Sequence, residues 1–263
     1  MSNRAIALHS REQIAALLRQ DIALHLYAIG DLDDFFWPST QWYALDADGA
    51  ARAPILCYDA GDLLVLHALG DVAALSELIG HIAHLLPRRI YTHLSPGVEP
   101  AFATHYALED HGAYAKMLLA DRSAIAMVDT SAAEVLTVAD TVEALAFYAD
   151  AYPHGWFDAR MLQTGQYVGM RHGGRLASVA GVHVYSPSQR VAAIGNVATL
   201  PALRGRGLAT VAVAALCALL GETVDVIGLN VRCDNASAIG CYERLGFTTV
   251  GEYGEWMLTQ KEP

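Results

Sequence analysis

The feature that most constrains this chain is a glycine–arginine run that leads directly into a long apolar segment. The run is RGRGLA at Arg204–Ala209, and the apolar segment continues through Val211–Leu220. Glycine adopts backbone angles that other residues avoid, so the run predicts a tight loop. The apolar segment is too short to span a bilayer and predicts a buried helix. Such a helix directs its first unpaired backbone amides toward the loop.

These amides and the positive end of the helix dipole favour an oxyanion, most commonly a phosphate. Arg204 and Arg206 add positive charge there, although the formal net charge is −11 and the only lysines are Lys116 and Lys261. The run lacks the lysine of a Walker loop, and Thr210 stands where a dinucleotide fingerprint has its third glycine. From the loop alone, a phosphate site and a glycine-rich turn with exposed arginines both stay open.

The composition predicts a folded chain with two cores, because 54% of the residues are hydrophobic and only 17% are charged. The acidic balance argues against a nucleic-acid-binding face, and no apolar run is long enough for a membrane span. The N-terminus has no apolar core of a secretory signal. The cysteines lack CxxC spacing, so we expect reduced thiols, no metal and a cytoplasmic protein. These cysteines are Cys57, Cys217, Cys233 and Cys241.

Hydrophobic periodicity predicts a similar alternation of strands and helices in both halves of the chain. We place the boundary in the polar stretch Asp121–Glu134 and expect domains at residues 1–125 and 133–263. The first half begins with a helix at 14–26 and has no arginine–glycine loop. The second half begins with a helix whose apolar stripe is Val142, Leu145, Ala146 and Ala149. Its further elements are strands at 166–171, 176–185 and 191–198, a helix at 208–220, a strand at 225–231, a helix at 235–246 and a strand at 247–258.

A second motif follows the loop, after one intervening strand. It is NASAIGCYERLGF, which has the pattern Asn235-x-x-Ala238-x-x-x-Tyr242-x-x-x-Gly246-Phe247. Together with the Arg204-x-x-Gly207-x-Ala209 pattern upstream, this motif resembles the characteristic segments of the GCN5-related N-acetyltransferase (GNAT) superfamily. The resemblance covers residues 134–258, and the first half carries a weaker likeness.

The resemblance implies an α/β (α+β) fold, a mixed and mostly antiparallel sheet flanked by helices, with a splayed central strand pair. We expect two such domains in tandem, the first without a coenzyme A (CoA) loop. It also implies binding of acetyl-CoA or another acyl-CoA, with the loop amides around the CoA pyrophosphate. The residues expected at the cofactor are Val197, Ala198, Thr199, Arg204, Gly205, Arg206, Gly207, Leu208, Ala209, Thr210, Asn230 and Asn235.

The resemblance further assigns two catalytic groups. The backbone N–H of Val197 would polarise the thioester carbonyl, and Tyr242 would protonate the departing CoA thiolate. A phenol suits this second role because its pKa lies in the same range as that of a thiol. Tyr242 could alternatively pack beneath the cleft without chemistry.

No motif fixes the general base or the acceptor pocket. The candidates for the base are Glu143, Asp158, His183, Asn196 acting through a water, and Glu255. Trp156, Phe157 and His183 could line the pocket for the acceptor, although aromatic residues after a helix are also common in packing.

The predicted function is transfer of an acetyl group from acetyl-CoA to the primary amine of a small or amino-acid-like molecule by direct attack. Two alternatives stay open, a non-catalytic acyl-CoA-binding module and a protein N-acetyltransferase. We expect no nucleic-acid or membrane partner, and the sequence leaves the oligomeric state open.

Overall fold

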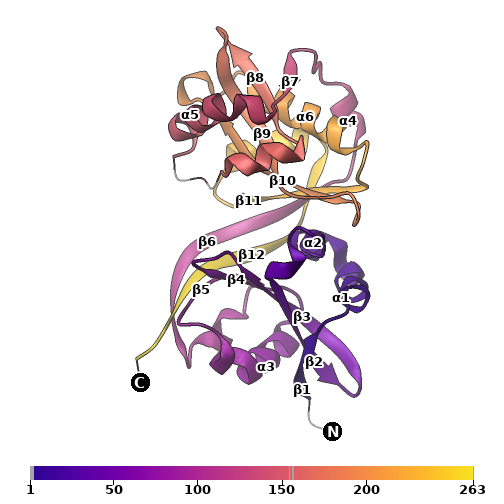
Figure 1. The fold of residues 1–263 in the computed structure, drawn as a ribbon, viewed down its shortest axis with the longest axis vertical. Helices are drawn as coiled ribbons and strands as arrows, with labels where there is room; N and C mark the ends of the chain where they lie inside the picture. Colours follow the sequence, from indigo (N-terminus) through magenta and orange to yellow (C-terminus); the bar gives the residue numbers. More distant parts are fainter. Residues whose placement is uncertain (1–2, 154, 156, 263) are drawn as a thin grey trace. The chain divides into compact units, whose positions relative to one another are not determined.

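The computed structural model describes residues 3–153, 155 and 157–262 and divides into two compact units (Figure 1). The first unit comprises Met1–Lys116, Arg232–Asp234 and Val250–Pro263, and the second comprises Met117–Val231 and Asn235–Thr249. Strands β6 (Tyr106–Leu119) and β12 (Phe247–Gln260) contribute residues to both units. The units are therefore not two consecutive segments, and the domains at 1–125 and 133–263 stay a prediction.

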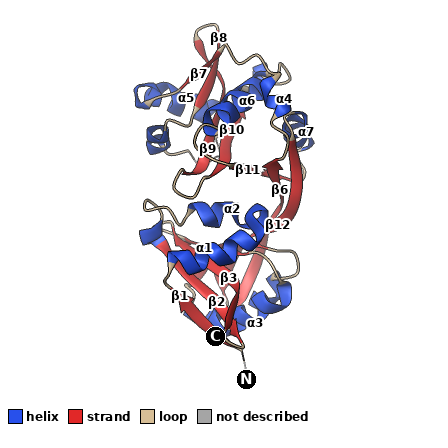
Figure 2. Ribbon diagram, turned by 90° about the vertical axis from the view of Figure 1, so that its right-hand side faces the viewer, coloured by secondary structure: helices blue, strands red, loops and turns tan. Residues whose placement is uncertain are grey.

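The first unit is a mixed sheet in the order β1-β2-β3-β4-β5-β12-β6, in which β4 and β5 pair in parallel and β1–β2, β2–β3, β3–β4 and β5–β12 pair antiparallel. Helices α1 and α2 lie on one face of this sheet and α3 lies on the other (Figures 1 and 2). The element bounds are β1 (Arg4–Leu8), α1 (Arg11–Leu18), α2 (Ile22–Gly30), β2 (Thr40–Ala47), β3 (Ala50–Asp59), β4 (Leu64–Ala68), α3 (Val72–Ile82) and β5 (Arg89–Leu94).

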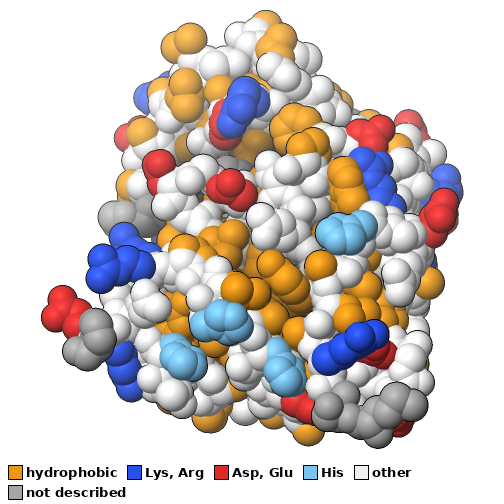
Figure 3. Space-filling model, turned by 60° about the horizontal axis from the view of Figure 1, so that its bottom comes forward, with side chains coloured by type: hydrophobic (Ala, Val, Ile, Leu, Met, Phe, Trp, Pro, Cys, Tyr) orange, Lys and Arg blue, Asp and Glu red, His pale blue; other side chains and the backbone are white. Residues whose placement is uncertain are grey.

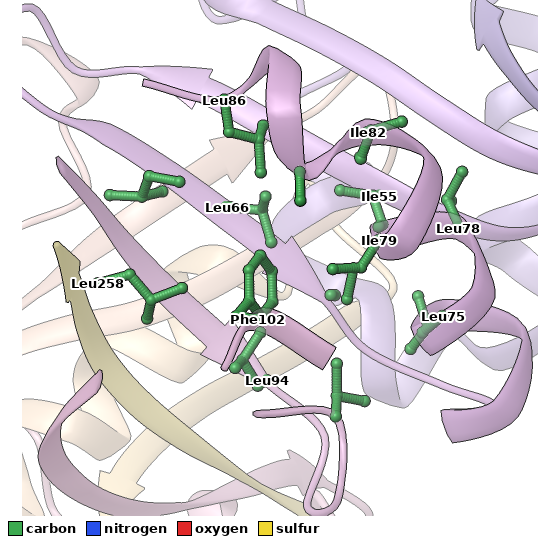
Figure 4. Close-up of a cluster of buried hydrophobic side chains, with 14 of the residues drawn as sticks. Ile55, Leu66, Leu75, Leu78, Ile79, Ile82, Leu86, Leu94, Phe102 and Leu258 are labelled. Atoms are coloured by element: carbon green, nitrogen blue, oxygen red, sulfur yellow. The ribbon is translucent and has the colours of Figure 1, made fainter. Parts of the chain in front are cut away.

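The face under α3 forms a hydrophobic core (Figure 4). Apolar residues recur along α3 at helical spacing, at Leu75, Leu78, Ile79 and Ile82, and all four are buried. Alternate residues of β3, β4, β5 and β12 meet them, as expected for one face of a pleated sheet. The strand residues of this core include Ile55, Cys57, Leu66, Ala68, Ile90, Leu94 and Leu258.

Within the second unit the strand order is β6-β11-β10-β9-β8-β7. Helix α6 packs on β8, β9 and β10, and α5 packs on β9 and β10. The predicted mixed sheet with flanking helices is confirmed. The bounds are α4 (Ser123–Ala126), β7 (Ala133–Val135), α5 (Thr141–Ala151), β8 (Val168–His172), β9 (Arg175–Ser186), β10 (Val191–Thr199), α6 (Leu208–Leu220), β11 (Val226–Arg232) and α7 (Ala236–Arg244). Short 3-10 turns lie at Arg19–Asp21, Trp37–Ser39, Ala83–Leu85, Glu99–Phe102, Val138–Asp140, Ala159–Thr164 and Pro201–Leu203.

The helix predicted at 14–26 is instead two helices, α1 and α2. The side chain of Asp21 accepts a hydrogen bond from the Leu24 amide at 3.0 Å and so starts a new helix. The prediction that Val142 and Leu145 lie on the buried side of α5 is also wrong. Both side chains are exposed, Val142 to 81%. The buried side is Ala144, Phe147, Tyr148 and Ala151. Burial of Phe147 and Tyr148 removes more apolar area from water than burial of the predicted stripe would.

Gly246 is held where no other residue fits. Its φ is +90°, and a Cβ there would lie 1.9 Å from the carbonyl oxygen of Asp121. Its own carbonyl accepts hydrogen bonds from the amides of Ala120 and Asp121. We expect Gly246→Ala to lower the free energy of unfolding by about 3 kcal/mol, measured by urea denaturation. Gly240→Ala, within α7 and without such a clash, is the control, and equal losses in both variants would contradict this account.

Candidate active site

Strands β10 and β11 begin as a parallel pair and then separate. Their register runs from Val191 opposite Val226 to Ile194 opposite Leu229, whereas β10 continues to Thr199. On its other side β10 has a register shift against β9 between Gly195 and Ala198. The splayed strand pair expected from the sequence is therefore present. The stretch of β10 around Val197 is left outside the β11 register, so that its backbone can pair with an extended ligand.

Hydrogen bonds from neighbouring side chains hold the irregular turn of β10 at Asn196. Asn196 has a φ of +52°, which is uncommon outside glycine. The hydroxyl of Tyr148 donates to the Asn196 carbonyl at 2.7 Å, and the Asn196 side-chain amide donates to the Tyr167 hydroxyl at 3.0 Å. A Cβ at Gly195 would lie 1.8 Å from the His183 ring, so this position requires glycine. These contacts fix the geometry of the bulge and thereby the position of the Val197 amide.

The glycine–arginine loop reaches α6 through two left-handed glycines. Gly205 and Gly207 have φ of 74° and 78°, and nothing lies within 4 Å of a Cβ built on either. Gly207 is the N-cap of α6, and in the described chain no side chain caps this helix and no acidic residue lies in its first turn. The first-turn amides of Leu208, Ala209 and Thr210 are thus left to an external acceptor.

The two arginines of the loop differ in their surroundings. The Arg204 guanidinium donates to the Thr199 carbonyl at 3.2 Å and to the Ala151 carbonyl at 3.5 Å. It therefore ties the loop to the end of β10 and to the end of α5. Arg206 is exposed, and its side chain can reach an anion that binds at the loop.

In the first unit, the strand pair and helix that correspond to β10, β11 and α6 are β4, β5 and α3. There β4 and β5 pair along their whole shared length, from Leu64 opposite Ile90 to Ala68 opposite Leu94. The helix that follows, α3, is capped by Asp71, whose carboxylate accepts from the Ala74 amide at 2.7 Å. This carboxylate already supplies the negative charge that a helix N-terminus favours. The first unit therefore lacks both the splay and the open helix N-terminus.

Tyr242 lies on α7 as a buried phenol. It is 7% exposed, its ring centroid is 5.9 Å from that of Phe247, and burial raises its pKa. The Asn235 side chain caps α7 by accepting from the Ala238 amide at 3.1 Å. Thr210 joins α6 to α7, because its hydroxyl lies 3.2 Å from the Cys241 sulfur. A phenol that keeps its proton can act as an acid.

The other predicted cofactor residues lie along β10 and β11. Ala198 is buried, and its carbonyl accepts from the Ser178 hydroxyl at 3.0 Å. Thr199 is half-buried and its hydroxyl lies 2.8 Å from that of Ser178. Asn230 is half-buried on β11, one residue beyond the last registered pair with β10.

Two carboxylates proposed as the general base are bound to arginines. The Glu143 carboxylate accepts from Arg171 at 2.7 Å and from the Leu176 amide at 3.0 Å, and these bonds lower its pKa. Asp158 accepts from Arg160 at 2.8 Å, which likewise lowers its pKa. Both groups are therefore held as charged ends of ion pairs.

The remaining candidates are divided between the units. Glu255 belongs to the first unit, whereas His183 and Asn196 lie at the β10 bulge. Burial lowers the pKa of His183 and keeps its ring neutral, although hydrogen bonding with Asn196 acts in the opposite direction. Phe157 stacks on Tyr148 with centroids 4.3 Å apart. Trp156 lies outside the described residues.

Tyr148 and Tyr167 are the site residues that sequence reasoning missed. Tyr148 stands in the segment predicted as a helix, and Tyr167 in a segment predicted as a strand, and nothing local marks either hydroxyl. Their role depends on the Asn196 bulge, which is formed by tertiary contacts.

The described residues were also compared with the requirements of a membrane span, a metal site and a reactive thiol. Within residues 3–153, 155 and 157–262, no helix is long and apolar enough to cross a membrane. In the same part of the chain, no group of three or more His, Cys, Asp or Glu side chains could hold a metal ion. Basic and acidic side chains are interspersed on the face shown in Figure 3. All four cysteines are free thiols, and burial raises the pKa of Cys57 and Cys217 to about 12.

Comparison with known proteins agrees with this geometry. The model of the acetyltransferase (GNAT) family matches residues 134–247, which include the splayed strands, the glycine loop and the whole of the second motif. Residues 134–247 belong to the GNAT family. The protein is accordingly a transferase. Among curated proteins, none matches the sequence.

Solved structures share the fold of the GNAT domain and of the whole chain. A GNAT-family acetyltransferase from Novosphingobium aromaticivorans is 24% identical, with a TM-score of 0.57 over 79% of this chain and 89% of that one. A GNAT protein from Sphaerobacter thermophilus is 15% identical, with a TM-score of 0.61 over 98% and 96%. A tandem GNAT protein of clavulanic acid biosynthesis is 13% identical, with a TM-score of 0.60 over 100% and 99%. The predicted tandem architecture is therefore confirmed as a fold.

Proposed function

We propose that the protein is an N-acetyltransferase that moves the acetyl group of acetyl-CoA to the primary amine of a small molecule in the cytoplasm. The observation that carries this proposal is the splayed β10–β11 pair beside the uncapped N-terminus of α6. An extended thioester fits the splay, and a pyrophosphate fits the helix N-terminus. Tyr242 supplies a buried phenol on the neighbouring helix α7.

In the proposed binding mode, the amides of Gly205–Thr210 bind the pyrophosphate, and Arg206 adds a charge-assisted contact. The backbone of Val197–Thr199 pairs with the pantetheine arm. The Val197 N–H donates to the thioester carbonyl, a role that is worth about 3 kcal/mol when the donor is preorganised.

In the proposed chemical step, the neutral amine attacks the thioester carbon, a C–N bond forms and the C–S bond breaks. Tyr242 donates its proton to the departing thiolate. Of the base candidates, we retain His183 for the proton of the amine, because it is neutral and lies at the bulge. Glu143 and Asp158 are excluded because arginines already hold their carboxylates.

Two other functions use the same site, a non-catalytic acyl-CoA sensor and a protein N-acetyltransferase. The test is release of free CoA from acetyl-CoA in the presence of a panel of small amines and of basic peptides. Release that depends on a small amine supports the proposal, and release with peptides alone supports the protein acetylase. Acetyl-CoA binding without release under any condition supports the sensor.

Removal of the Tyr148 hydroxyl should slow the reaction without weakening cofactor binding. Tyr148→Phe loses the 2.7 Å bond to the Asn196 carbonyl, so the bulge and the Val197 amide lose a fixed position. We expect kcat to fall about tenfold, with KM for acetyl-CoA within about twofold. The control is Tyr106→Phe, which removes a hydroxyl that donates to the Pro87 carbonyl at 3.0 Å in the first unit. A rise in KM alone would assign Tyr148 to cofactor binding instead.

A further inference from the structure

The second unit contains a cavity of about 430 Å³ between α6 and residues 119–130, the segment that includes α4. Cavities that hold small molecules in proteins enclose roughly 300–1,000 Å³, so this one is large enough for a ligand. The α6 residues that line it are Ala214, Cys217 and Ala218, and Gly221 follows at the end of the helix. Because these side chains are short, they leave the space between the helix and residues 119–130 unfilled.

The opposite wall of this α6 cavity is apolar as well. It is formed by Leu119 at the end of β6, Ile125 in α4 and Val128 after α4. Ile125 is buried, whereas Leu119 and Val128 are half-buried. An apolar group that enters the cavity is therefore removed from water on both sides, which favours its binding.

Two side chains of opposite charge, Arg122 and Glu222, lie at the mouth of the α6 cavity. Both are exposed, and neither forms an ion pair within residues 3–153, 155 and 157–262. The neighbouring Asp225 carboxylate is bound by the Arg190 guanidinium through two N–O distances of 2.5 Å, so it is already neutralised. The mouth therefore offers one cation and one anion beside an apolar interior.

The Arg122 guanidinium is held in place at the turn that follows α6. Its Nη2 donates to the Asp225 carbonyl at 2.8 Å, and its Nη1 lies 3.1 Å from a Cβ built on Gly221. A guanidinium has five N–H donors, so this bond leaves donors for the carboxylate of a ligand. Glu222 follows Gly221 directly, so the acceptor for an ammonium group belongs to the same turn.

The two charges and the apolar interior together select among small ligands. A fatty acid has no cation for Glu222, and an alkylamine has no anion for Arg122. A residue within a peptide chain has neither charge on its backbone. A free α-amino acid with an apolar side chain has both charges on one carbon atom, directly beside an apolar group.

We propose that the α6 cavity binds a free α-amino acid with an apolar side chain. Arg122 binds the carboxylate, Glu222 binds the ammonium group, and the apolar side chain lies between α6 and residues 119–130. The glycine–arginine loop precedes the first residue of α6, whereas the cavity lies along the second half of the helix. The amino-acid site and the proposed acetyl-CoA site therefore share no residue, and neither requires the other.

The experiment is calorimetric titration of the full chain with L-leucine and with three analogues, in the absence of acetyl-CoA. The analogue 4-methylpentanoate lacks the ammonium group, 3-methylbutylamine lacks the carboxylate, and N-acetyl-L-leucinamide lacks both charges. We expect leucine to bind at least about tenfold more tightly than each analogue, because each analogue loses a charge-assisted hydrogen bond. Absence of leucine binding, or binding of any analogue as tightly as leucine, would overturn the proposal.

A cavity-filling variant then locates the bound leucine. Ala218→Trp places a large side chain in the cavity from an exposed position of α6, and Ala146→Trp makes the same change at an exposed position of α5. We expect Ala218→Trp to weaken leucine binding at least about tenfold and Ala146→Trp to leave it unchanged. Retained binding in Ala218→Trp would place leucine elsewhere in the protein, including the acceptor site of the proposed transfer reaction, and would refute the assignment.

Two further variants test the charges at the mouth. Arg122→Gln and Glu222→Gln should each weaken leucine binding about tenfold, whereas Arg175→Gln, at an exposed arginine of β9, should not. Arg122→Gln should also leave the affinity for 3-methylbutylamine unchanged, because that analogue has no carboxylate. If Arg122→Gln does not fold, Glu222→Gln and Ala218→Trp still decide. Unchanged leucine binding in Glu222→Gln would contradict the proposed recognition of the ammonium group.

Discussion

Gly207→Glu should abolish acetyl-CoA binding. Gly207 is the N-cap of α6 with a φ of 78°, and a glutamate there puts a negative charge at the helix end proposed to hold the pyrophosphate. The carboxylate would compete for the same amides and repel the phosphates. We expect the dissociation constant to rise about a hundredfold or more, which corresponds to about 3 kcal/mol. Calorimetric titration of acetyl-CoA and of desulfo-CoA measures it.

The matched control for this variant is Gly174→Glu. Gly174 lies in the turn between β8 and β9, has a φ of 81°, and also has nothing within 4 Å of an added Cβ. The two substitutions therefore introduce the same side chain into the same backbone conformation. Loss of binding in Gly207→Glu alone locates the cofactor at the loop. Unchanged binding in Gly207→Glu would remove the loop, and with it the proposed cofactor residues, from the site.

Tyr242→Phe should lower kcat about a hundredfold while acetyl-CoA binding changes by no more than about twofold. The substitution keeps the buried ring and its packing on Phe247 but removes the proton proposed for the thiolate. Steady-state kinetics with the best acceptor amine measure the two parameters. Because burial raises the pKa of Tyr242, the unaltered enzyme should show no loss of activity from this group up to pH 10.

Tyr185→Phe provides the comparison for this second variant. The Tyr185 hydroxyl donates to the Thr223 hydroxyl at 3.0 Å, in the same unit. We expect its kcat to stay within about twofold of the unaltered enzyme. A similar fall in both variants would mean that Tyr242 contributes packing and no proton.

Local motifs made part of the site predictable. The loop at Arg204–Ala209 and the segment after Asn235 are each continuous in sequence. Each lies at the start of a helix, α6 or α7, and that position determines what it can bind. Backbone amides at a helix N-terminus form wherever the helix begins, whatever surrounds it. The GNAT domain was accordingly predictable from residues that are neighbours in the chain.

The remainder depends on contacts between distant segments. The Asn196 bulge is held by Tyr148 and Tyr167, which lie 48 and 29 residues away in sequence. The stripe of α5 was mispredicted because periodicity alone cannot rank two apolar faces of one helix. In the first unit, the neighbouring side chains of His67, His93 and Glu255 likewise come from three strands, and nothing in the local sequence predicts that they meet.

The placement of β12 has a consequence for how the protein is made. In the first unit β12 lies between β5 and β6, so it is an interior strand of that sheet. The ribosome synthesises β12 after the whole of α7, and therefore after nearly all of the second unit. Until then, β5 and β6 each present an unpaired edge, which invites association with other chains. Although its first residues emerge early, the first unit must complete its sheet late in synthesis, so the nascent chain depends on protection of those two edges.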